Sequence, residues 1–328
     1  SDLVSYWQQH HKSCDFADVL SFQPSLCEHN LAPKQVQTPD YAAVANYGYH
    51  LNAGKFAKLL QHHCKYNLGV NHLVDDVDIV HLNARIDENI YEYYQSKHIP
   101  VIATNHLYVA DETPRFQWVH VSKTMADLYD EKHYIWCGLD SENYIYKTQK
   151  EDYYLFMADN TRHVGKGLDI ALELTQKLNK KLIVAGSSKH MNDIKTVQKL
   201  CDTYNATYVG DVIGLEKARL LANATAFLSP SRLPETFGIT LIEALFSGTP
   251  VICSNNGAYG EIISKDVGFV CDVPSDYELA FKNIKHIKSD VCRSYAMSNF
   301  HYLKTTEKYI KIYNDILISK RQNNFVNY

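Results

Sequence analysis

Long apolar runs are missing from this 328-residue sequence, and no segment is long and apolar enough to span a bilayer. The first residues do not resemble a signal peptide, so we expect none. The formal net charge of −4 argues against nonspecific binding to nucleic acid. These absences predict a cytoplasmic protein. We expect at most a peripheral association with the inner face of the membrane, because no basic amphipathic helix is apparent.

Cysteine and histidine motifs for metals are missing as well. None of the eight cysteines forms a C-x-x-C pair, and several lie in apolar, strand-like runs, which indicates buried free thiols in a reducing compartment. The run Asp76-Val77-Asp78 directly precedes an apolar strand. The neighbours in His10-His11 and His62-His63 would point in different directions on a helix, so neither pair can chelate. We therefore expect no metal site.

The two commonest nucleotide-binding motifs are absent. No G-x-G-x-x-G run follows an apolar strand, which weighs against a nicotinamide dehydrogenase. No G-x-x-x-x-G-K-[ST] run occurs, which weighs against a P-loop nucleotidase.

The most informative segment is residues 234–245, in which Glu235 and Glu243 stand on either side of a Phe-Gly pair. An apolar strand at 225–230 precedes this segment, and a helical pattern follows the Phe-Gly pair. The amides of residues 237–240 then lie at a helix N-terminus, where an anion such as a diphosphate binds. Carboxylates on each side can accept hydrogen bonds from sugar hydroxyls. The arrangement suits a nucleotide sugar, which has a charged middle and polyhydroxylated ends.

This segment resembles the retaining glycosyltransferases of family 4, which have the GT-B fold. The hallmark of that family is a Glu, seven residues and a second Glu, which are Glu235 and Glu243 here, within the run P-E-x-F-G…E-A. The resemblance is strong over roughly residues 150–320 and looser before them. Further marks of the family are Gly-Leu-Asp at 138–140, Lys-Gly at 166–167, the strand and turn at 181–186, Tyr-Val-Gly-Asp at 208–211 and Gly-x-x-x-Glu at 257–261.

The resemblance implies an α/β protein with two Rossmann-like domains facing across a cleft and a C-terminal helix that crosses back to the first domain. We expect an acceptor-side domain at 1–145, a nucleotide-sugar-binding domain at 146–302 and the C-terminal helix at 303–328. Alternating strand and helix patterns predict parallel sheets covered on both faces. In the first domain, residues 41–64 are predicted to be largely helical.

The apolar pattern also predicts individual elements. Strands are expected near 18–22, 78–82, 101–104, 118–122, 154–157, 182–185, 207–209, 226–228, 251–253 and 268–271. Helices are expected near 90–97, 124–129, 167–178, 191–204, 215–221, 239–246, 257–263, 276–288 and 301–319.

One family feature is missing from the start of the sequence. The family opens with a strand and a Gly-Gly loop that approaches the sugar and phosphates, whereas the first glycines here are Gly48 and Gly54. Either the sequence lacks its beginning or the protein lacks this loop. In the second case, acceptor binding and catalysis would both be affected.

By this resemblance, Glu235 would bind hydroxyls of the donor sugar and Glu243 those of the ribose. Lys166 would contact the diphosphate and stabilise it as it leaves. An ammonium at a helix start is disfavoured by the helix dipole, so a bound anion gives Lys166 a reason to be there. The family's usual Arg is replaced by Asp159, and Arg162 would substitute for it from a longer loop.

His106 follows a strand at the place where the family has a histidine facing the donor sugar, although a structural histidine is the alternative. His81 is a weaker candidate, because Asn83 replaces the family's second histidine. Four main-chain amides are expected to bind the diphosphate, those of Phe237, Gly238, Ile239 and Thr240. Two further residues, Leu215 and Glu216, lie where the family reads the nucleobase.

The sequence thus predicts a retaining glycosyltransferase of polysaccharide or glycoconjugate synthesis. It would move a sugar from a nucleotide-diphosphate donor, with UDP favoured over GDP, to a hydroxyl of a glycan, a lipid-linked or a small-molecule acceptor. No cofactor beyond this donor is expected. One alternative is a nucleotide-sugar epimerase or phosphorylase of the same fold. The other is a non-catalytic, glycosyltransferase-like binding subunit, which the missing loop and the missing Arg would fit.

Overall fold

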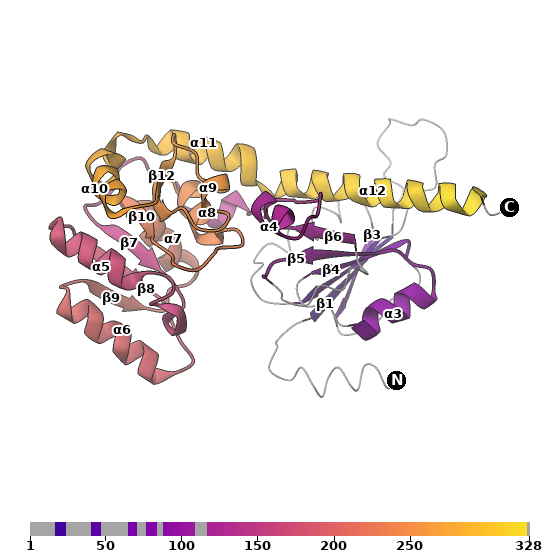
Figure 1. Cartoon of the computed structure of the whole chain (residues 1–328), viewed down its shortest axis with the longest axis horizontal. Coiled ribbons are helices and arrows are strands. Elements are labelled where there is room, and N and C mark those ends of the chain that lie inside the picture. Colours follow the sequence, from indigo (N-terminus) through magenta and orange to yellow (C-terminus); the bar gives the residue numbers. More distant parts are fainter. Residues whose placement is uncertain are drawn as a thin grey trace. The chain divides into compact units, whose positions relative to one another are not determined.

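The computed structural model describes residues 17–23, 41–46, 65–70, 77–83, 88–108 and 117–326. The chain divides into two compact units, each built on a six-stranded sheet (Figure 1). The first unit comprises Ser1–Val121, Ala126–Ile135 and Thr305–Tyr328, and the second comprises Ser122–Met125 and Trp136–Lys304.

The second unit is a doubly wound α/β domain, with six parallel strands in the order β12-β11-β10-β7-β8-β9. All the strands expected in it are present. They are β7 (Tyr154–Met157), β8 (Leu182–Ala185), β9 (Thr207–Gly210), β10 (Ala226–Ser229), β11 (Val251–Ser254) and β12 (Gly268–Cys271). The helices are α5 (Leu168–Lys177), α6 (Met191–Thr203), α7 (Gly214–Asn223), α8 (Ile239–Phe246), α9 (Tyr259–Ile262), α10 (Pro274–Asn283) and α11 (Ser289–Phe300). Single 3-10 turns form η1 (Ser141–Asn143), η2 (Asn160–Arg162) and η3 (Ile284–His286).

The strands of this sheet are short apolar runs, such as Leu-Ile-Val-Ala in β8, because helices cover both faces of a parallel sheet. Helix α5 buries four residues at the i, i+3, i+4, i+7 spacing of a single helical face. They are Leu168, Ala171, Leu172 and Thr175. Three of them pack with Tyr154 of β7 and with residues of α6 and α10 in one apolar core. The local pattern of each element therefore decides which of its faces is buried.

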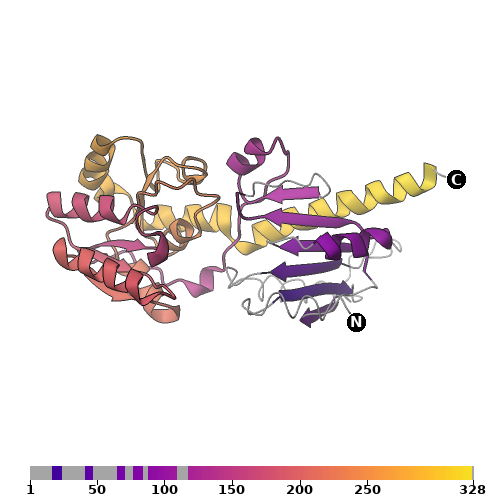
Figure 2. The same cartoon turned by 60° about the horizontal axis from the view of Figure 1, so that its bottom comes forward.

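The first unit holds a mixed sheet in the order β3-β1-β2-β4-β5-β6 (Figures 1 and 2). Strands β2, β4, β5 and β6 are parallel, and β1 runs antiparallel to both of its neighbours. The strands are β1 (Ala17–Gln23), β2 (Tyr41–Asn46), β3 (Lys65–Val70), β4 (Ile79–Asn83), β5 (Val101–Asn105) and β6 (Gln117–His120). The helices described are α3 (Glu88–Ser96), α4 (Lys123–Leu128) and α12 (Tyr302–Val326). The first residues of α4 and of α12 belong to the second unit, and the rest of both helices belongs to the first.

Two expectations for the first unit are wrong. Residues 41–46 form a strand rather than a helix, because pairing with β1 on one side and β4 on the other outweighs the helical propensity of an alanine-rich run. The sheet is not purely parallel, because β1 is reversed, and the sequence pattern does not predict β3. The rest of the predicted helix, residues 47–64, lies outside the described residues.

Helix α12 confirms the expected return of the C-terminal helix to the first domain. Its residues Tyr309, Tyr313 and Leu317 follow an i, i+4, i+8 spacing and are buried against the first sheet. They pack there with Ile79 of β4, Ile102 of β5, Val119 of β6 and Ile135.

A buried polar network joins α12 to the sheet. The ring of His81 hydrogen-bonds the Tyr313 hydroxyl through Nδ1 and the Thr104 hydroxyl through Nε2, both at 2.6 Å. The Thr104 hydroxyl also hydrogen-bonds Tyr309 at 2.7 Å. Burial lowers the pKa of His81 from 6.5 to about 3, so the imidazole is neutral at physiological pH. His81 therefore has a structural role in the first unit.

We predict that acidification weakens the first unit through His81. The unfolded chain binds a proton at this residue below pH 6.5 and the folded chain does not, so stability is lost as the pH falls from 6.5 toward 3. From pH 7.5 to pH 5.5 this residue should remove about 1.4 kcal/mol of unfolding free energy. Hydrogen exchange of the β4 and β5 amides, corrected for intrinsic rates, measures the loss within this unit.

Between pH 7.5 and pH 5.5, the variant His81→Gln should lose about 1.4 kcal/mol less protection than the wild type. His120, which burial also gives a lowered pKa of about 4, should continue to contribute in this variant. The exposed His133→Gln serves as the control and should behave as the wild type. Equal losses in wild type and His81→Gln would contradict the assignment.

Candidate functional site

Strand order reverses at the centre of the second sheet. The chain runs from β7 outward through β8 and β9, then returns to β10 beside β7 and continues outward through β11 and β12. In open α/β sheets, ligands bind at the carboxyl ends of the strands at such a reversal. Lys166 lies in the loop after β7, and Glu235 lies in the loop after β10. The topology therefore brings both predicted site residues to the same point.

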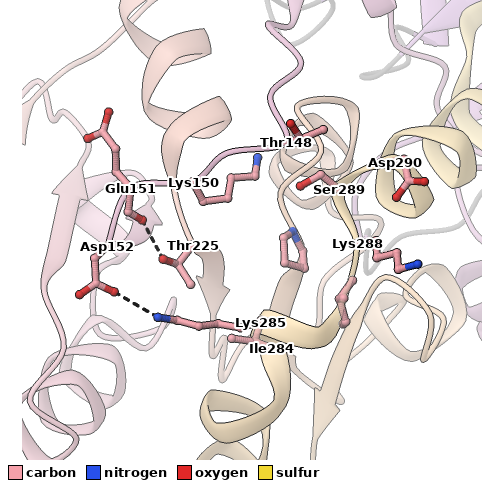
Figure 3. Close-up of a pocket in the computed structure, with 12 residues that line it drawn as sticks. Thr148, Lys150, Glu151, Asp152, Thr225, Ile284, Lys285, Lys288, Ser289 and Asp290 are labelled. Carbon is pink, nitrogen blue, oxygen red and sulfur yellow. Dashed lines mark hydrogen bonds and ion pairs between the residues drawn. The ribbon is translucent and has the colours of Figure 1, made fainter.

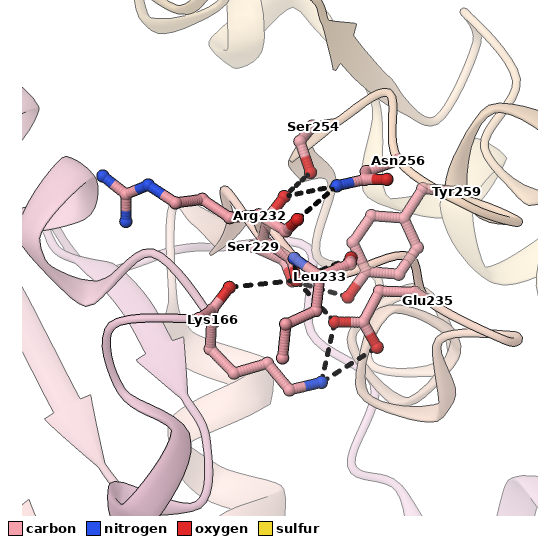
Figure 4. A network of polar contacts seen from close by, with 10 residues as sticks. Lys166, Ser229, Arg232, Leu233, Glu235, Ser254, Asn256 and Tyr259 are labelled. Atoms are coloured by element: carbon pink, nitrogen blue, oxygen red, sulfur yellow. Dashed lines mark hydrogen bonds and ion pairs between the residues drawn. The ribbon is translucent and has the colours of Figure 1, made fainter. Parts of the chain in front are cut away.

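Lys166 and Glu235 form an ion pair at this point (Figure 4). The Lys166 ammonium donates to both carboxylate oxygens of Glu235, at 2.7 and 2.9 Å. The buried Ser231 hydroxyl donates to the same carboxylate at 2.6 Å. The Lys166 and Glu235 side chains are 22% and 13% exposed. The pair is thus reachable by a ligand but largely shielded from water, where charge interactions are stronger than at an open surface.

The two loops that carry this pair are joined by main-chain and side-chain bonds. The Gly165 carbonyl accepts from the amides of Arg232 and Leu233, at 2.8 and 3.3 Å. The Arg232 guanidinium donates to the Val164 carbonyl and to both oxygens of Asp169, at 2.6 and 2.7 Å. This bidentate contact lowers the pKa of Asp169. In Figure 4 the Arg232 side chain extends away from Glu235, so it holds the loop rather than the ion pair.

Two glycines allow the backbones to approach closely around the ion pair. Gly257 forms an isolated bridge with Glu235 and has φ +66°, and a Cβ there would lie 2.2 Å from the Glu235 carbonyl oxygen. Gly167, with φ +77°, would bring a Cβ within 2.0 Å of the Pro230 carbonyl oxygen. Only glycine fits both the conformation and the space at these positions.

Helix α8 begins beside this pair, directly after Gly238. Its first main-chain donors, Leu241 and Ile242, both bond to the Gly238 carbonyl, at 3.0 and 3.3 Å. The amides of Ile239 and Thr240 lie at the start of α8, before the first residue that donates a hydrogen bond within the helix. Such N-terminal amides bind anions. The Phe237 ring is buried, with its centroid 6.0 Å from that of Phe300, so the ring is not available to a ligand.

Glu243 lies one helical turn after Ile239 and is buried. Its side chain is 4% exposed and is paired with the Lys217 ammonium of α7, at 2.8 and 2.7 Å from the two carboxylate oxygens. The Tyr144 hydroxyl, just after η1, donates to the same carboxylate at 3.1 Å. Burial raises the pKa of Tyr144, and the negative charge of Glu243 raises it further. The sequence analysis does not identify Lys217 or Tyr144 as partners of Glu243.

The remaining predicted residues occupy different places. Asp159, in the usual position of the family's Arg, caps η2 by accepting from the amide and hydroxyl of Thr161, at 2.9 and 2.8 Å. Arg162 ends η2 with an exposed side chain, and its carbonyl accepts from the Lys166 amide at 2.8 Å. Leu215 and Glu216 are exposed in the first turn of α7.

His106 lies in the first unit and the donor-side residues lie in the second. It directly follows β5 and is half-buried. Among the residues that the structure describes, no cluster of three or more His, Cys, Asp or Glu side chains could hold a metal ion. None of the described helices combines the length and the hydrophobicity needed to cross a bilayer.

A cavity of about 520 Å³ opens at the other end of the second sheet (Figure 3). Its walls include Thr148, residues 150–152, Thr225 and Pro250, which precede strands β7, β10 and β11 and so lie at their amino ends. Lys150 in this wall donates to the carbonyls of Ala222 and Ser247, near the ends of α7 and α8, at 2.8 and 3.2 Å. Burial lowers its pKa to about 8. These bonds stabilise helix C-termini, which accounts for the lysine without a ligand.

Comparison with solved structures identifies the fold. AviGT4, a glycosyltransferase involved in avilamycin A biosynthesis, matches with a TM-score of 0.62 and 23% identity, over 74% of this chain and 75% of that one. Anabaena HepE in complex with UDP-glucose matches with a TM-score of 0.58 and 14% identity, over 74% and 79%. The protein therefore has the fold of the GT-B glycosyltransferases.

Comparison with families and curated proteins concerns mainly the second unit. Residues 141–299, just under half of the chain, match the family described as glycosyl transferases group 1. The sulfoquinovosyl transferase SQD2 of Arabidopsis thaliana is 27% identical over 169 residues, which are 47% of this chain and 32% of that protein. The chain thus spans about a third of the length of the first curated relatives that it matches.

A second family, described as tryptophan halogenase, matches residues 1–97. The sequence of this range contains the glycines Gly48, Gly54 and Gly69, and they do not form a G-x-G-x-x-G run. The match therefore brings no dinucleotide-binding motif of that kind.

We predict that Gly257→Ala destabilises the second unit more than a matched change elsewhere. The new Cβ would overlap the Glu235 backbone, so the loop must move or the bridge must break. Gly210→Ala is the control, because Gly210 has a similar φ of +75° but no atom within 4 Å of its Cβ position. Thermal melting should show a loss several degrees larger for Gly257→Ala, about 1–3 kcal/mol. Equal losses would mean that the approach to Glu235 is not tight.

Proposed function

We propose that this protein is a retaining glycosyltransferase that moves a sugar from a UDP-sugar to a hydroxyl acceptor, in polysaccharide or glycoconjugate synthesis in the cytoplasm. The observation that carries the proposal is the Lys166–Glu235 ion pair at the strand reversal, beside the start of α8. The fold, the family match over residues 141–299 and the UDP-glucose complex of a structural neighbour support it.

The donor's diphosphate would bind at the N-terminus of α8. The amides of Ile239 and Thr240 would donate to its oxygens, and the ammonium of Lys166 would move from Glu235 to the phosphate. Lys166 would then stabilise the charge that develops as the diphosphate leaves, an effect that grows in a shielded site. Arg162, which precedes Lys166 by four residues, would add a second cation.

Glu235, released from Lys166, would accept hydrogen bonds from hydroxyls of the donor sugar. Ser231 keeps its hydrogen bond to the carboxylate and so preserves the orientation of Glu235 during this exchange. The bond between the anomeric carbon and the phosphate oxygen would break. The acceptor oxygen would then attack from the same face, and its proton would pass to a phosphate oxygen.

The first unit would supply the acceptor side, with His106 as its candidate residue. The acceptor class is a glycan, a lipid-linked molecule or a small molecule with a free hydroxyl. One observation favours a second candidate function. Asp159 is committed to capping η2 where the family has its Arg, and a binding subunit without transferase activity would tolerate that replacement.

We predict that Lys166→Met and Glu235→Gln each lower sugar transfer about 100-fold or more. Each change removes a group that acts on the donor. Because the pair is largely shielded, each change also costs some stability, so thermal melting must show that both variants stay folded at the assay temperature. A donor screen by mass spectrometry identifies the sugar, and initial rates with that donor measure the loss. Lys177→Met removes a lysine from the exposed Lys177–Glu278 pair of the same unit and should leave transfer unchanged.

Calorimetry with UDP, GDP and ADP separates the two functions. Binding of UDP together with transfer or donor hydrolysis supports the transferase. Binding of UDP without either reaction supports the non-catalytic subunit. If none of the three nucleotides binds at millimolar concentration, both proposals are wrong.

A further inference from the structure

The cavity at the amino ends of the second sheet has a helix N-terminus in its wall. Helix α11 begins there with Ser289, and the side chain of the preceding residue, Lys288, forms no capping hydrogen bond. Within the described part of the chain, the first α11 amide with a main-chain acceptor is that of Cys292, which donates to the Lys288 carbonyl at 3.2 Å. The amides of residues 289–291 are therefore left for another acceptor, at the positive end of the helix dipole.

The Ser289 hydroxyl is a second group in this wall that lacks a partner. The residue is only 9% exposed, and its hydroxyl forms no hydrogen bond with any residue that the structure describes. In Figure 3 the side chain points toward the part of the cavity where Thr148 and Lys150 lie. Burying a hydroxyl without a hydrogen bond is unfavourable, so an acceptor placed in the cavity would stabilise it.

Lys150 brings a positive charge to the same end of α11. Its ammonium interacts electrostatically with the Cys292 thiol, which places the lysine beside the first turn of the helix. The ammonium donates to the Ala222 and Ser247 carbonyls and, at 2.8 Å, to the Thr249 hydroxyl, so all three N–H groups are used. No carboxylate of the described residues pairs with it, and burial lowers its pKa to about 8. Lys150 thus needs no further hydrogen bond, but an anion nearby would offset the burial of its charge.

The carboxylates of the cavity wall leave the space in front of Ser289 open. Asp152 is paired with Lys285 at 3.5 Å. Glu151 and Asp290 are exposed, and in Figure 3 their carboxylates do not point toward the Ser289 hydroxyl. The wall holds three lysines and three acids, so its formal charges cancel and any attraction for an anion is local to the start of α11.

The cavity is larger than a single anion requires. Its volume of about 520 Å³ lies within the range of small-molecule pockets, about 300–1,000 Å³. Pro250, Ile284 and Ile287 give part of the wall an apolar surface. The uncharged part of an organic molecule could lie against these three residues while its anionic group lies at α11.

We propose that this cavity binds a small phosphorylated molecule, with its phosphate group at the N-terminus of α11. The amides of Asp290 and Val291 and the Ser289 hydroxyl would donate to the phosphate oxygens, and Lys150 would stabilise the charge. This site is separate from the proposed donor site, which lies at the carboxyl ends of strands of the same sheet. Its failure would therefore leave the proposed function untouched.

The test follows backbone amide signals by NMR while inorganic phosphate is added to the full chain. The proposal expects saturable shifts at the amides of Asp290 and Val291. The amides of Ile239 and Thr240 report phosphate at the proposed donor site separately. Absence of a saturable shift at α11 would overturn the proposal.

A variant and its control identify the group responsible. Ser289→Ala should weaken phosphate binding at α11 about tenfold, because the phosphate loses a charge-assisted hydrogen bond. Ser298→Ala removes an exposed serine from the last turns of the same helix and should keep the wild-type affinity. Equal affinities in wild type and Ser289→Ala would contradict the proposed site.

A second variant, Ser289→Asp, places a carboxylate where the phosphate would lie. It should abolish the phosphate shifts at α11 and leave the melting temperature close to that of the wild type, because the helix amides and Lys150 stabilise the new charge. A buried carboxylate without such partners is strongly unfavourable. A large fall in melting temperature would show that this part of the cavity does not accept an anion, and the proposal would be wrong.

Discussion

The ion pair between Lys166 and Glu235 is the constraint on which the proposed donor site depends. It exists because β7 and β10 are adjacent, although 69 residues separate the two side chains. The pair neutralises both charges in a largely shielded place. A phosphate alone would take Lys166 and leave Glu235 without its cation, and a free sugar would leave Lys166 without its anion. A nucleotide sugar supplies both partners together, so the pair would favour the complete donor over its fragments.

The second lysine–glutamate pair has a different character because it is buried more deeply. Glu243 has two protein partners, Lys217 and Tyr144, and they come from separate elements. Tyr144 also stacks on Phe246 with ring centroids 5.6 Å apart, which fixes the segment after η1 against α8. The pair therefore connects α7, α8 and the segment after η1. In the proposed donor site the Lys166–Glu235 pair would exchange partners with a ligand, whereas the Lys217–Glu243 pair holds the surrounding elements in place.

The sequence predicts most of the second unit because its signals are local. Short apolar strands, glycine stops and amphipathic helices follow each other in order, and parallel pairing then brings Lys166 and Glu235 to one edge. What it does not predict depends on distant partners. Residues 41–46 pair with two strands that their own pattern does not reveal, and this pairing overrides their helical propensity. Lys217 meets Glu243 only after two helices pack, and no local motif marks that contact.

The charge balance of the proposed site shows what the donor would require. Lys166, Glu235, Lys217 and Glu243 sum to zero, so the donor's diphosphate would bring about two negative charges into a neutral cluster. The N-terminus of α8 offsets roughly half a charge. Arg162 stands one turn before Lys166, carries an exposed side chain and follows η2, whose start Asp159 fixes by capping. Arg162 is therefore the residue that we propose compensates the rest, in place of the arginine that the resemblance expects at Asp159.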